Sequence, residues 1–212
     1  MMHTNMRFIG ITGGVGAGKS EVLSYLRNKP KTKVMLADEI AHTLMEPGTD
    51  CYQKIVETFV GEDIFETSKS EASLPENRPF HRGKLAEVIF SNEEKRKQMN
   101  AIVHPAVKDY VESIYQEELK KGQIEYLVLE AALLIEEKYD EVCDELWYIY
   151  TSEENRRNRL KESRGYSDEK IDYIMASQLS EEAFRAATKR TIDNNGNLKE
   201  TYRQIDEALE ER

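Results

Sequence analysis

Runs of consecutive apolar residues alternate with amphipathic stretches along most of the chain. The runs typical of β-strands occupy residues 7–12, 33–38, 125–135 and 145–151. Apolar residues at helical spacing occupy 19–29, 40–45, 52–60, 168–187 and 197–212, and 153–164 is expected to be a polar, arginine-rich helix. Strands that alternate with helices in this way predict an α/β fold, a parallel sheet with helices on both faces.

The middle of the chain departs from this alternation. Residues 66–80 have no apolar periodicity and predict a loop, whereas 82–121 are strongly helical, with a break expected near His104-Pro105. The stretch 66–122 is longer than a simple crossover between parallel strands needs. We therefore expect it to be an inserted helical lobe that binds a substrate.

Composition narrows the class of protein. The 212 residues are 39% hydrophobic and 33% charged, which suits one large domain with a polar surface. Cys51 and Cys143 form no CxxC pair, so we expect a reduced protein without structural zinc. The longest apolar run, 126–135, is far shorter than the roughly 18 residues of a membrane span. The N-terminus also lacks the apolar segment of a signal peptide, which predicts a cytoplasmic protein.

The formal net charge of −10 argues against a general nucleic-acid binder, because such proteins concentrate positive charge on one face. Any phosphate chemistry must therefore depend on a local group of positive charges.

A glycine-rich segment, "GGVGAGKS" at 13–20, follows the first strand and opens the first helix. It fits the G-x-x-x-x-G-K-[ST] pattern, in which backbone N–H groups and a helix N-terminus surround phosphate oxygens. In this pattern Lys19 reaches the β- and γ-phosphates and the Ser20 hydroxyl ligates Mg²⁺. The predicted nucleotide-binding residues are Gly14, Val15, Gly16, Ala17, Gly18, Lys19 and Ser20.

Guanine recognition is not supported. The nearest match to N-K-x-D is "NKPK" at 28–31, which lacks the aspartate, and "DNNG" at 193–196 fits a DxxG switch only by its letters. We therefore discount a GTPase, which leaves motor-type ATPases and small-molecule kinases.

Two carboxylates lie in predicted strands. One is at the end of a strand, and the other is inside an apolar strand. Asp38 closes the strand 33–38, where it can orient an attacking hydroxyl or accept its proton, or can serve as the N-cap of the next helix. Glu130 lies within an apolar strand, where its charge requires a partner. That partner is either Mg²⁺ with its waters or a salt bridge.

Positive charge gathers after the fourth strand, where 155–167 carries Arg156, Arg157, Arg159 and Arg164. In a lid these arginines would stabilise the charge of a transferring phosphoryl group. Each alone also fits a solvated helix face with acidic neighbours. For the cluster as a whole we favour the lid.

The chain resembles the dephospho-CoA kinase family from about residue 7 to 209. The segments that carry the resemblance are "ITGGVGAGKS", "ADEIAHTLMEPG", "HRGKLAEVIFSNEEKRKQMNAIVHPAV", "VLEAALLIEEKYD", "IMASQ" and "IDNNG". The block from Arg82 to His104-Pro105 is the most distinctive of them. The resemblance implies transfer of the ATP γ-phosphate, with Mg²⁺, to the ribose 3′-hydroxyl of dephospho-CoA, the last step of coenzyme A synthesis.

The resemblance also implies roles for single residues. Asp38 matches the catalytic aspartate, Arg82 an arginine near the acceptor, and His104 the family's His-Pro, although His104 can equally be a helix-packing residue. Glu130 replaces an aspartate and is expected to act on Mg²⁺ through water. Arg159 and Arg164 are expected to close the lid.

The implied organisation has three parts in one P-loop kinase domain. The nucleotide-binding core covers about 7–65, 123–152 and 188–212, the acceptor lobe about 66–122, and the lid about 153–187. The expected partners are ATP and dephospho-CoA, with no nucleic acid and no membrane, in a monomer or weak homo-oligomer.

Several positions depart from the family's usual pattern: Leu36, Ala132, Ser163 and Thr188-Lys189. These departures keep two alternatives open. One is another P-loop nucleoside or nucleotide kinase, and the other is a nucleotide-binding protein without transfer activity.

Overall fold

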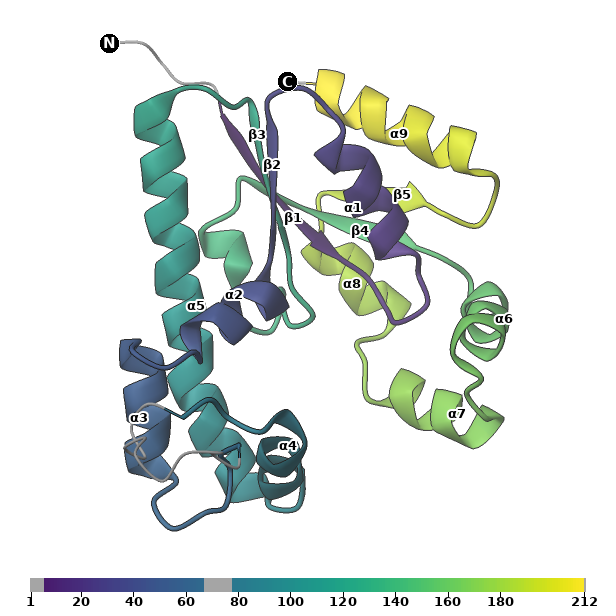
Figure 1. The fold of residues 1–212 in the computed structure, drawn as a ribbon. Helices are drawn as coiled ribbons and strands as arrows, with labels where there is room; N and C mark the ends of the chain where they lie inside the picture. Colours follow the sequence, from purple (N-terminus) through teal and green to yellow (C-terminus); the bar gives the residue numbers. More distant parts are fainter. Residues whose placement is uncertain (1–5, 67–77, 212) are drawn as a thin grey trace. The chain divides into compact units, whose positions relative to one another are not determined.

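The computed structural model describes residues 6–66 and 78–211, which divide into two compact units (Figure 1). The first unit runs to Leu36 and resumes at Tyr115, and the second is Ala37–Ile114. The strands are β1 (Arg7–Thr12), β2 (Thr32–Leu36), β3 (Tyr126–Glu130), β4 (Glu145–Tyr150) and β5 (Arg190–Asp193). The helices of the first unit are α1 (Lys19–Arg27), η2 (Tyr139–Glu141), α6 (Glu153–Arg164), α7 (Asp168–Ala176), α8 (Glu181–Ala187) and α9 (Leu198–Glu210). The second unit contains α2 (Ala37–Leu44), α3 (Asp50–Thr58), α4 (Arg82–Phe90) and most of α5 (Glu93–Lys121).

The five strands form one parallel sheet in the order β2-β3-β1-β4-β5. This confirms the predicted α/β fold. β1 lies at the centre, where Ile11 pairs with Glu130 of β3 on one side and with Trp147 of β4 on the other. Because all strands run in one direction, their carboxyl ends meet at a single edge of the sheet.

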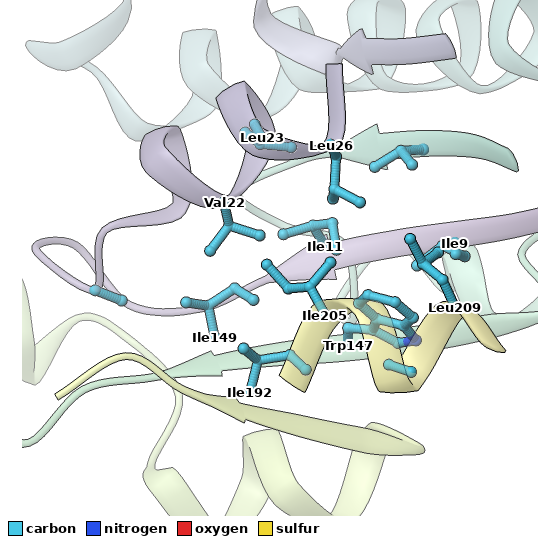
Figure 2. Close-up of a cluster of buried hydrophobic side chains, with 13 residues drawn as sticks. Ile9, Ile11, Val22, Leu23, Leu26, Trp147, Ile149, Ile192, Ile205 and Leu209 are labelled. Carbon is cyan, nitrogen blue, oxygen red and sulfur yellow. The ribbon is translucent and has the colours of Figure 1, made fainter. Parts of the chain in front are cut away.

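One face of the sheet is covered by α1 and α9 (Figure 2). Alternate residues of β1 and β4 point to this face and are fully buried, among them Ile9, Ile11 and Trp147. They pack against Val22 and Leu26 of α1 and against apolar residues of α9. The buried positions alternate along the strands and recur about every 3.6 residues along the helices, as expected where helices pack on a sheet.

The opposite face is covered by the end of α5 and by α8. Phe8 of β1 stacks on Tyr115 with ring centroids 5.2 Å apart, and Tyr148 of β4 stacks on Phe184 at 4.8 Å. Helices therefore cover both faces of the sheet, as predicted, and bury its central strands most fully. Within the described ranges, no helix is both long and apolar enough to cross a membrane.

The second unit has its own core. Tyr52 of α3 packs on Phe80 with centroids 4.7 Å apart and donates a hydrogen bond from its hydroxyl to Arg78 O at 2.7 Å. A β-bridge joins Phe65 to Phe80 across the chain segment 67–77. Most of the loop predicted at 66–80 lies outside the described residues.

The helix break predicted near His104-Pro105 is wrong, because α5 runs unbroken for 29 residues with Pro105 inside it. Proline removes one backbone hydrogen bond, but a long helix with a buried stripe can offset this loss. Val103, Val107 and Val111 form that stripe at four-residue spacing. The actual break precedes α5, where Asn92 Oδ1 accepts hydrogen bonds from the N–H groups of Glu94 and Lys95.

Two other predicted elements have different bounds. The strand predicted at 125–135 ends at Glu130, and the apolar residues beyond it form turns. Leu134 of these turns is fully buried against Gly10, which explains why the sequence stays apolar after the strand ends. The helix predicted at 168–187 is two helices, because Ser180 caps a new one by accepting a hydrogen bond from Ala183 N.

A buried ion pair ties β1 to the last elements of the chain. The Glu145 side chain is 1% exposed and accepts a hydrogen bond from Arg7, with Lys189 Nζ 3.1 Å from its second oxygen. Arg7 also donates to the carbonyls of Ala208 and Leu209 at the end of α9. Burial alone would raise the pKa of Glu145, but the two cations outweigh it and lower that pKa below the ordinary value.

We expect Glu145→Gln to lower the free energy of unfolding at neutral pH by roughly 1–3 kcal/mol, since it leaves two cations without their anion. A lowered pKa stabilises the fold above the ordinary glutamate pKa of about 4.3, and this contribution is lost as the pH falls through the folded value. The difference from wild type should therefore shrink in acid. Urea unfolding followed by circular dichroism at several pH values measures it. The exposed Glu154→Gln is the control, and a difference that is independent of pH would contradict the assignment.

Candidate phosphate-transfer site

The glycine-rich loop lies between β1 and α1, where predicted. Gly18 is the N-cap of α1 and adopts a left-handed conformation with φ 85°. It has no side chain to satisfy the first N–H groups of the helix, so these remain available to an anion. The loop therefore has the backbone of a phosphate-binding site.

Two of the glycines are required by close packing as well as by conformation. At Gly13, with φ 149°, a Cβ would lie 2.7 Å from the Ile149 carbonyl oxygen of β4. At Gly18 a Cβ would lie 2.3 Å from Asn194 Nδ2. Side chains at these positions would push the loop away from the carboxyl ends of β4 and β5.

Lys19 and Glu130 lie together at the carboxyl edge of the sheet. Lys19 Nζ donates to Gly13 O at 2.7 Å and is 3.6 Å from Glu130 Oε1. Each side chain is 18% exposed. The salt bridge that the sequence left open for Glu130 is therefore present, and it is made with Lys19, the lysine predicted to bind phosphate. Ser20, the next residue of α1, is exposed.

Three side chains donate hydrogen bonds to one backbone carbonyl of the loop, that of Ala17. Thr151 Oγ1 donates to it at 3.0 Å, Asn194 Nδ2 at 2.8 Å and Arg159 Nη1 at 3.3 Å. Arg159 Nη2 also donates to Asn194 O at 2.7 Å. Arg159 thus lies at the loop, with its guanidinium occupied by backbone oxygens.

Thr151 and Asn194 were not among the predicted site residues. Asn194 belongs to the "IDNNG" segment that contributed to the family resemblance, and this segment is the signal that could have identified it. Thr151 directly follows β4, a position at the same sheet edge as the loop. It carries no distinctive sequence motif.

The other arginines of α6 have different surroundings. Arg156 Nε donates to Val15 O at 2.8 Å, and Arg156 Nη2 donates to Gln178 Oε1 at 2.6 Å. Burial lowers the pKa of Arg156 from its ordinary value. Arg164 ends α6, is exposed, and lies over the Tyr166 ring at 5.9 Å. The structure places Arg156 rather than Arg164 on the glycine-rich loop.

Asp38 lies in the second unit and is exposed. β2 ends at Leu36 and α2 begins at Ala37, so Asp38 is neither the last residue of a strand nor the N-cap of a helix. It is a first-turn residue of α2. Within the part of the chain that the structure describes, its carboxylate makes no hydrogen bond or ion pair with protein.

The second unit also contains a cavity of about 440 Å³ next to α4. Its mixed apolar and charged lining is His42, Met45, Glu46, Pro47, Glu66, Pro79, Phe80, His81, Arg82, Gly83 and Leu85. Arg82 is thus placed at a hollow large enough for part of a substrate. His104 lies half-buried on α5, outside this lining.

The described residues contain no group of three or more His, Cys, Asp or Glu side chains arranged to hold a metal ion. Ser20 and Glu130 are therefore the protein groups to consider for Mg²⁺. Magnesium commonly uses one or two protein ligands and completes its shell with water and phosphate oxygens. Ser20 and Glu130 fit this pattern of coordination, because they offer one hydroxyl and one carboxylate.

Comparisons with known proteins agree on one family. The family model described as CoaE, dephospho-CoA kinase, matches residues 7–200. A dephospho-CoA kinase of Shouchella clausii is 35% identical over 201 residues, which is 95% of this chain and 96% of that protein. One of Carboxydothermus hydrogenoformans is also 35% identical, over 93% and 90% of the two chains.

Solved structures show the same fold. The crystal structure of TT1252 from Thermus thermophilus has a TM-score of 0.71 at 26% identity and covers 96% of each chain. A dephospho-CoA kinase from Campylobacter jejuni has a TM-score of 0.62 at 19% identity, over 98% of this chain and 97% of that one.

Proposed function

Because this chain belongs to the dephospho-CoA kinase family, we propose that its glycine-rich loop binds ATP and that Asp38 orients the acceptor hydroxyl. The enzyme transfers the γ-phosphate of ATP to the ribose 3′-hydroxyl of dephospho-CoA, the last step of coenzyme A synthesis. The observation that carries this conclusion is the family match over 7–200, together with an open helix N-terminus at Gly18.

Charge neutralisation begins in the first unit. The N–H groups of the glycine-rich loop bind the β- and γ-phosphates, apart from those of Val15 and Ala17, which donate to Gln178 Oε1 and Gly14 O. Lys19 places its ammonium group beside the phosphates. Gly13 O and Glu130 already hold Lys19 at the carboxyl edge of the sheet. This preorganisation means that little reorientation is needed when the phosphates bind.

We also propose that Mg²⁺ accompanies the nucleotide, held by the Ser20 hydroxyl and, through water, by Glu130. When bound, the ion supplies positive charge to the phosphate oxygens as negative charge shifts toward the leaving group.

Asp38 is proposed to orient the 3′-hydroxyl and to accept its proton as the O–P bond forms. Its carboxylate is exposed and makes no protein hydrogen bond among the described residues, so it is available to a substrate. Arg82 and the cavity beside it are proposed to hold the acceptor, with His104 contributing to the same lobe.

We keep the proposed organisation of one domain with a core (about 7–65, 123–152 and 188–212), an acceptor lobe (about 66–122) and a lid (about 153–187). In the lid, Arg159 supports the loop by holding Ala17 and Asn194. That Arg164 contacts the nucleotide stays a prediction.

We further propose a cytoplasmic enzyme that works as a monomer or weak homo-oligomer and binds no nucleic acid. A net charge of −10 opposes nucleic-acid binding.

The proposal is tested by ADP release measured with and without dephospho-CoA. We expect release to depend on dephospho-CoA, with nucleosides and nucleoside monophosphates giving little. Equal or faster release with a nucleoside would assign a nucleoside kinase instead. ATP binding without release on any acceptor would mean that transfer activity has been lost.

The same assay on Arg82→Ala tests the acceptor site. We expect the Michaelis constant for dephospho-CoA to rise about tenfold or more, as for a lost charged hydrogen bond, with the constant for ATP unchanged. Lys84→Ala is a matched control, since Lys84 lies on the same helix and pairs with Asp63 at 2.7 Å outside the cavity. If the two variants behave alike, Arg82 has no special role.

A further inference from the structure

The four arginines of α6 differ in what neutralises them. Arg157 pairs with Glu153 at 2.8 Å and with Asp172 at 2.5 Å. Arg159 is occupied by the carbonyls of Ala17 and Asn194, and Arg164 extends toward solvent beside Tyr166. Arg156 contacts the glycine-rich loop at Gly14 and Val15, and it pairs with no carboxylate in the described part of the chain.

The Arg156 guanidinium lies directly on Gly14. A Cβ built on Gly14 would be 2.4 Å from Arg156 Nη2, 2.5 Å from Cζ and 2.8 Å from Nη1. The side chain is half-buried, and Nε is fixed by Val15 O at 2.8 Å. The bare glycine thus allows a planar cation to lie flat on the phosphate-binding loop.

This cation has no counter-ion in the described part of the chain. No carboxylate there lies within 4.0 Å of Arg156, and its Nη1 makes no hydrogen bond to protein. Burying a charge without an opposite charge is unfavourable, and burial accordingly lowers the pKa of Arg156. A bound anion that reaches Nη1 would remove this penalty.

We propose that Arg156 binds the terminal phosphates of ATP and that Gln178 is the residue that positions it. This inference rests on the proposed function, because it requires ATP at the glycine-rich loop. It adds a substrate-binding residue outside the glycine-rich motif and different from Arg159 and Arg164.

Gln178 has the geometry for a positioning role. Its Oε1 accepts hydrogen bonds from Arg156 Nη2 at 2.6 Å and from Val15 N at 3.2 Å. It therefore connects the α7–α8 segment to both the arginine and the loop. As a neutral group, it orients the guanidinium without neutralising the charge that the phosphates need.

The direct test is calorimetric binding of ATP, ADP and AMP to Arg156→Met, with turnover measured in parallel. We expect the dissociation constant for ATP to rise about 10- to 100-fold, as for a lost charge-assisted hydrogen bond, while AMP binding changes little. Arg156→Lys should restore part of the loss. Arg157→Met is the matched control on the same helix and should bind ATP as wild type does.

Two further variants change the surroundings of the Arg156 guanidinium without replacing Arg156 itself. Gly14→Ala adds a methyl where the guanidinium lies, at a residue whose φ is not positive, so it displaces Arg156 without straining the loop backbone. We expect it to weaken ATP binding as Arg156→Met does, and the double variant to be no worse than either one. Gln178→Glu keeps both acceptor contacts but adds a negative charge, so it should raise the Michaelis constant for ATP. A purely structural glutamine would tolerate that change.

Lys19→Ala separates the two levels of the proposal. If Arg156→Met and Gly14→Ala bind ATP as wild type does while Lys19→Ala does not, the role of Arg156 is wrong and the phosphate site stands. If Lys19→Ala also keeps full affinity, the proposed phosphate site itself is wrong. Should Arg156→Met fail to fold by circular dichroism, Gly14→Ala and Gln178→Glu decide the question.

Discussion

Asp38→Asn is expected to lower kcat by about 10²- to 10⁴-fold, the usual contribution of a general base, with little change in ATP affinity. The substitution keeps the size and hydrogen-bonding reach of the side chain but cannot accept a proton. Because the structure places Asp38 inside the first turn of α2 and not at its N-cap, the structural role left to test is stabilisation of that first turn. A residue that only stabilised α2 would tolerate the change.

Glu39→Gln is the matched control for this variant. Glu39 is the next residue, is also exposed, and shares the first turn of α2. Both variants remove one negative charge from the same helix end, so the helix-dipole effect is similar in the two. Steady-state ADP release and ATP binding measure the outcome. Near-normal turnover in Asp38→Asn would reduce Asp38 to a surface residue.

Lys19→Ala is expected to lower kcat/KM for ATP by about 10³-fold, comparable to losing a preorganised charge-stabilising donor. This substitution has two effects on the phosphate site. The ammonium beside the phosphates disappears, and Glu130, 3.6 Å away, is left as a negative charge near them. The second effect predicts that Lys19→Ala/Glu130→Gln recovers part of the affinity for ATP when binding is measured without Mg²⁺.

Lys31→Ala controls for the loss of one positive charge in the same unit. Lys31 is exposed and forms a surface ion pair with Glu125 at 2.6 Å. Such pairs contribute little to stability, so this variant should behave as wild type. Binding measured by calorimetry and turnover measured by ADP release provide both comparisons. If Lys19→Ala retained wild-type kcat/KM, the glycine-rich loop would not be the nucleotide site.

The parallel sheet could be predicted because burial on both faces leaves a clear signature. β1 and β4 are almost fully buried and accordingly mostly apolar, with Arg7 and Glu145 paired at their first residues. The same rule failed after Glu130, since a turn that packs Leu134 against Gly10 is just as apolar as a strand. Apolar content reports burial and does not by itself report backbone geometry.

The helix through Pro105 shows the limit of local rules. Proline predicts a break when only its neighbours are considered. In α5 the buried valines before and after it favour continuation, and that preference depends on tertiary packing. Asn92, by contrast, begins the helix through a local hydrogen bond of the kind that sequence can indicate.

The candidate site divides in the same way. The glycine-rich loop and Lys19 belong to one contiguous motif whose spacing specifies its geometry. Asn194 and Gln178 reach the loop from positions far along the chain. Which of several neighbouring arginines faces the loop depends on the rotation of α6 about its axis, and a pattern of charges alone does not determine that rotation.

The position of β1 in the sheet has a consequence for how a nascent chain acquires this structure. β1 is synthesised first, yet Arg7 pairs in register with Tyr126, and β4 begins only at Glu145. No strand pair of the sheet can form until β3 has left the ribosome, because β2 also pairs with β3. Ile9 and Ile11 therefore lack their strand partners through more than half of translation, a long-range topology that favours slow folding.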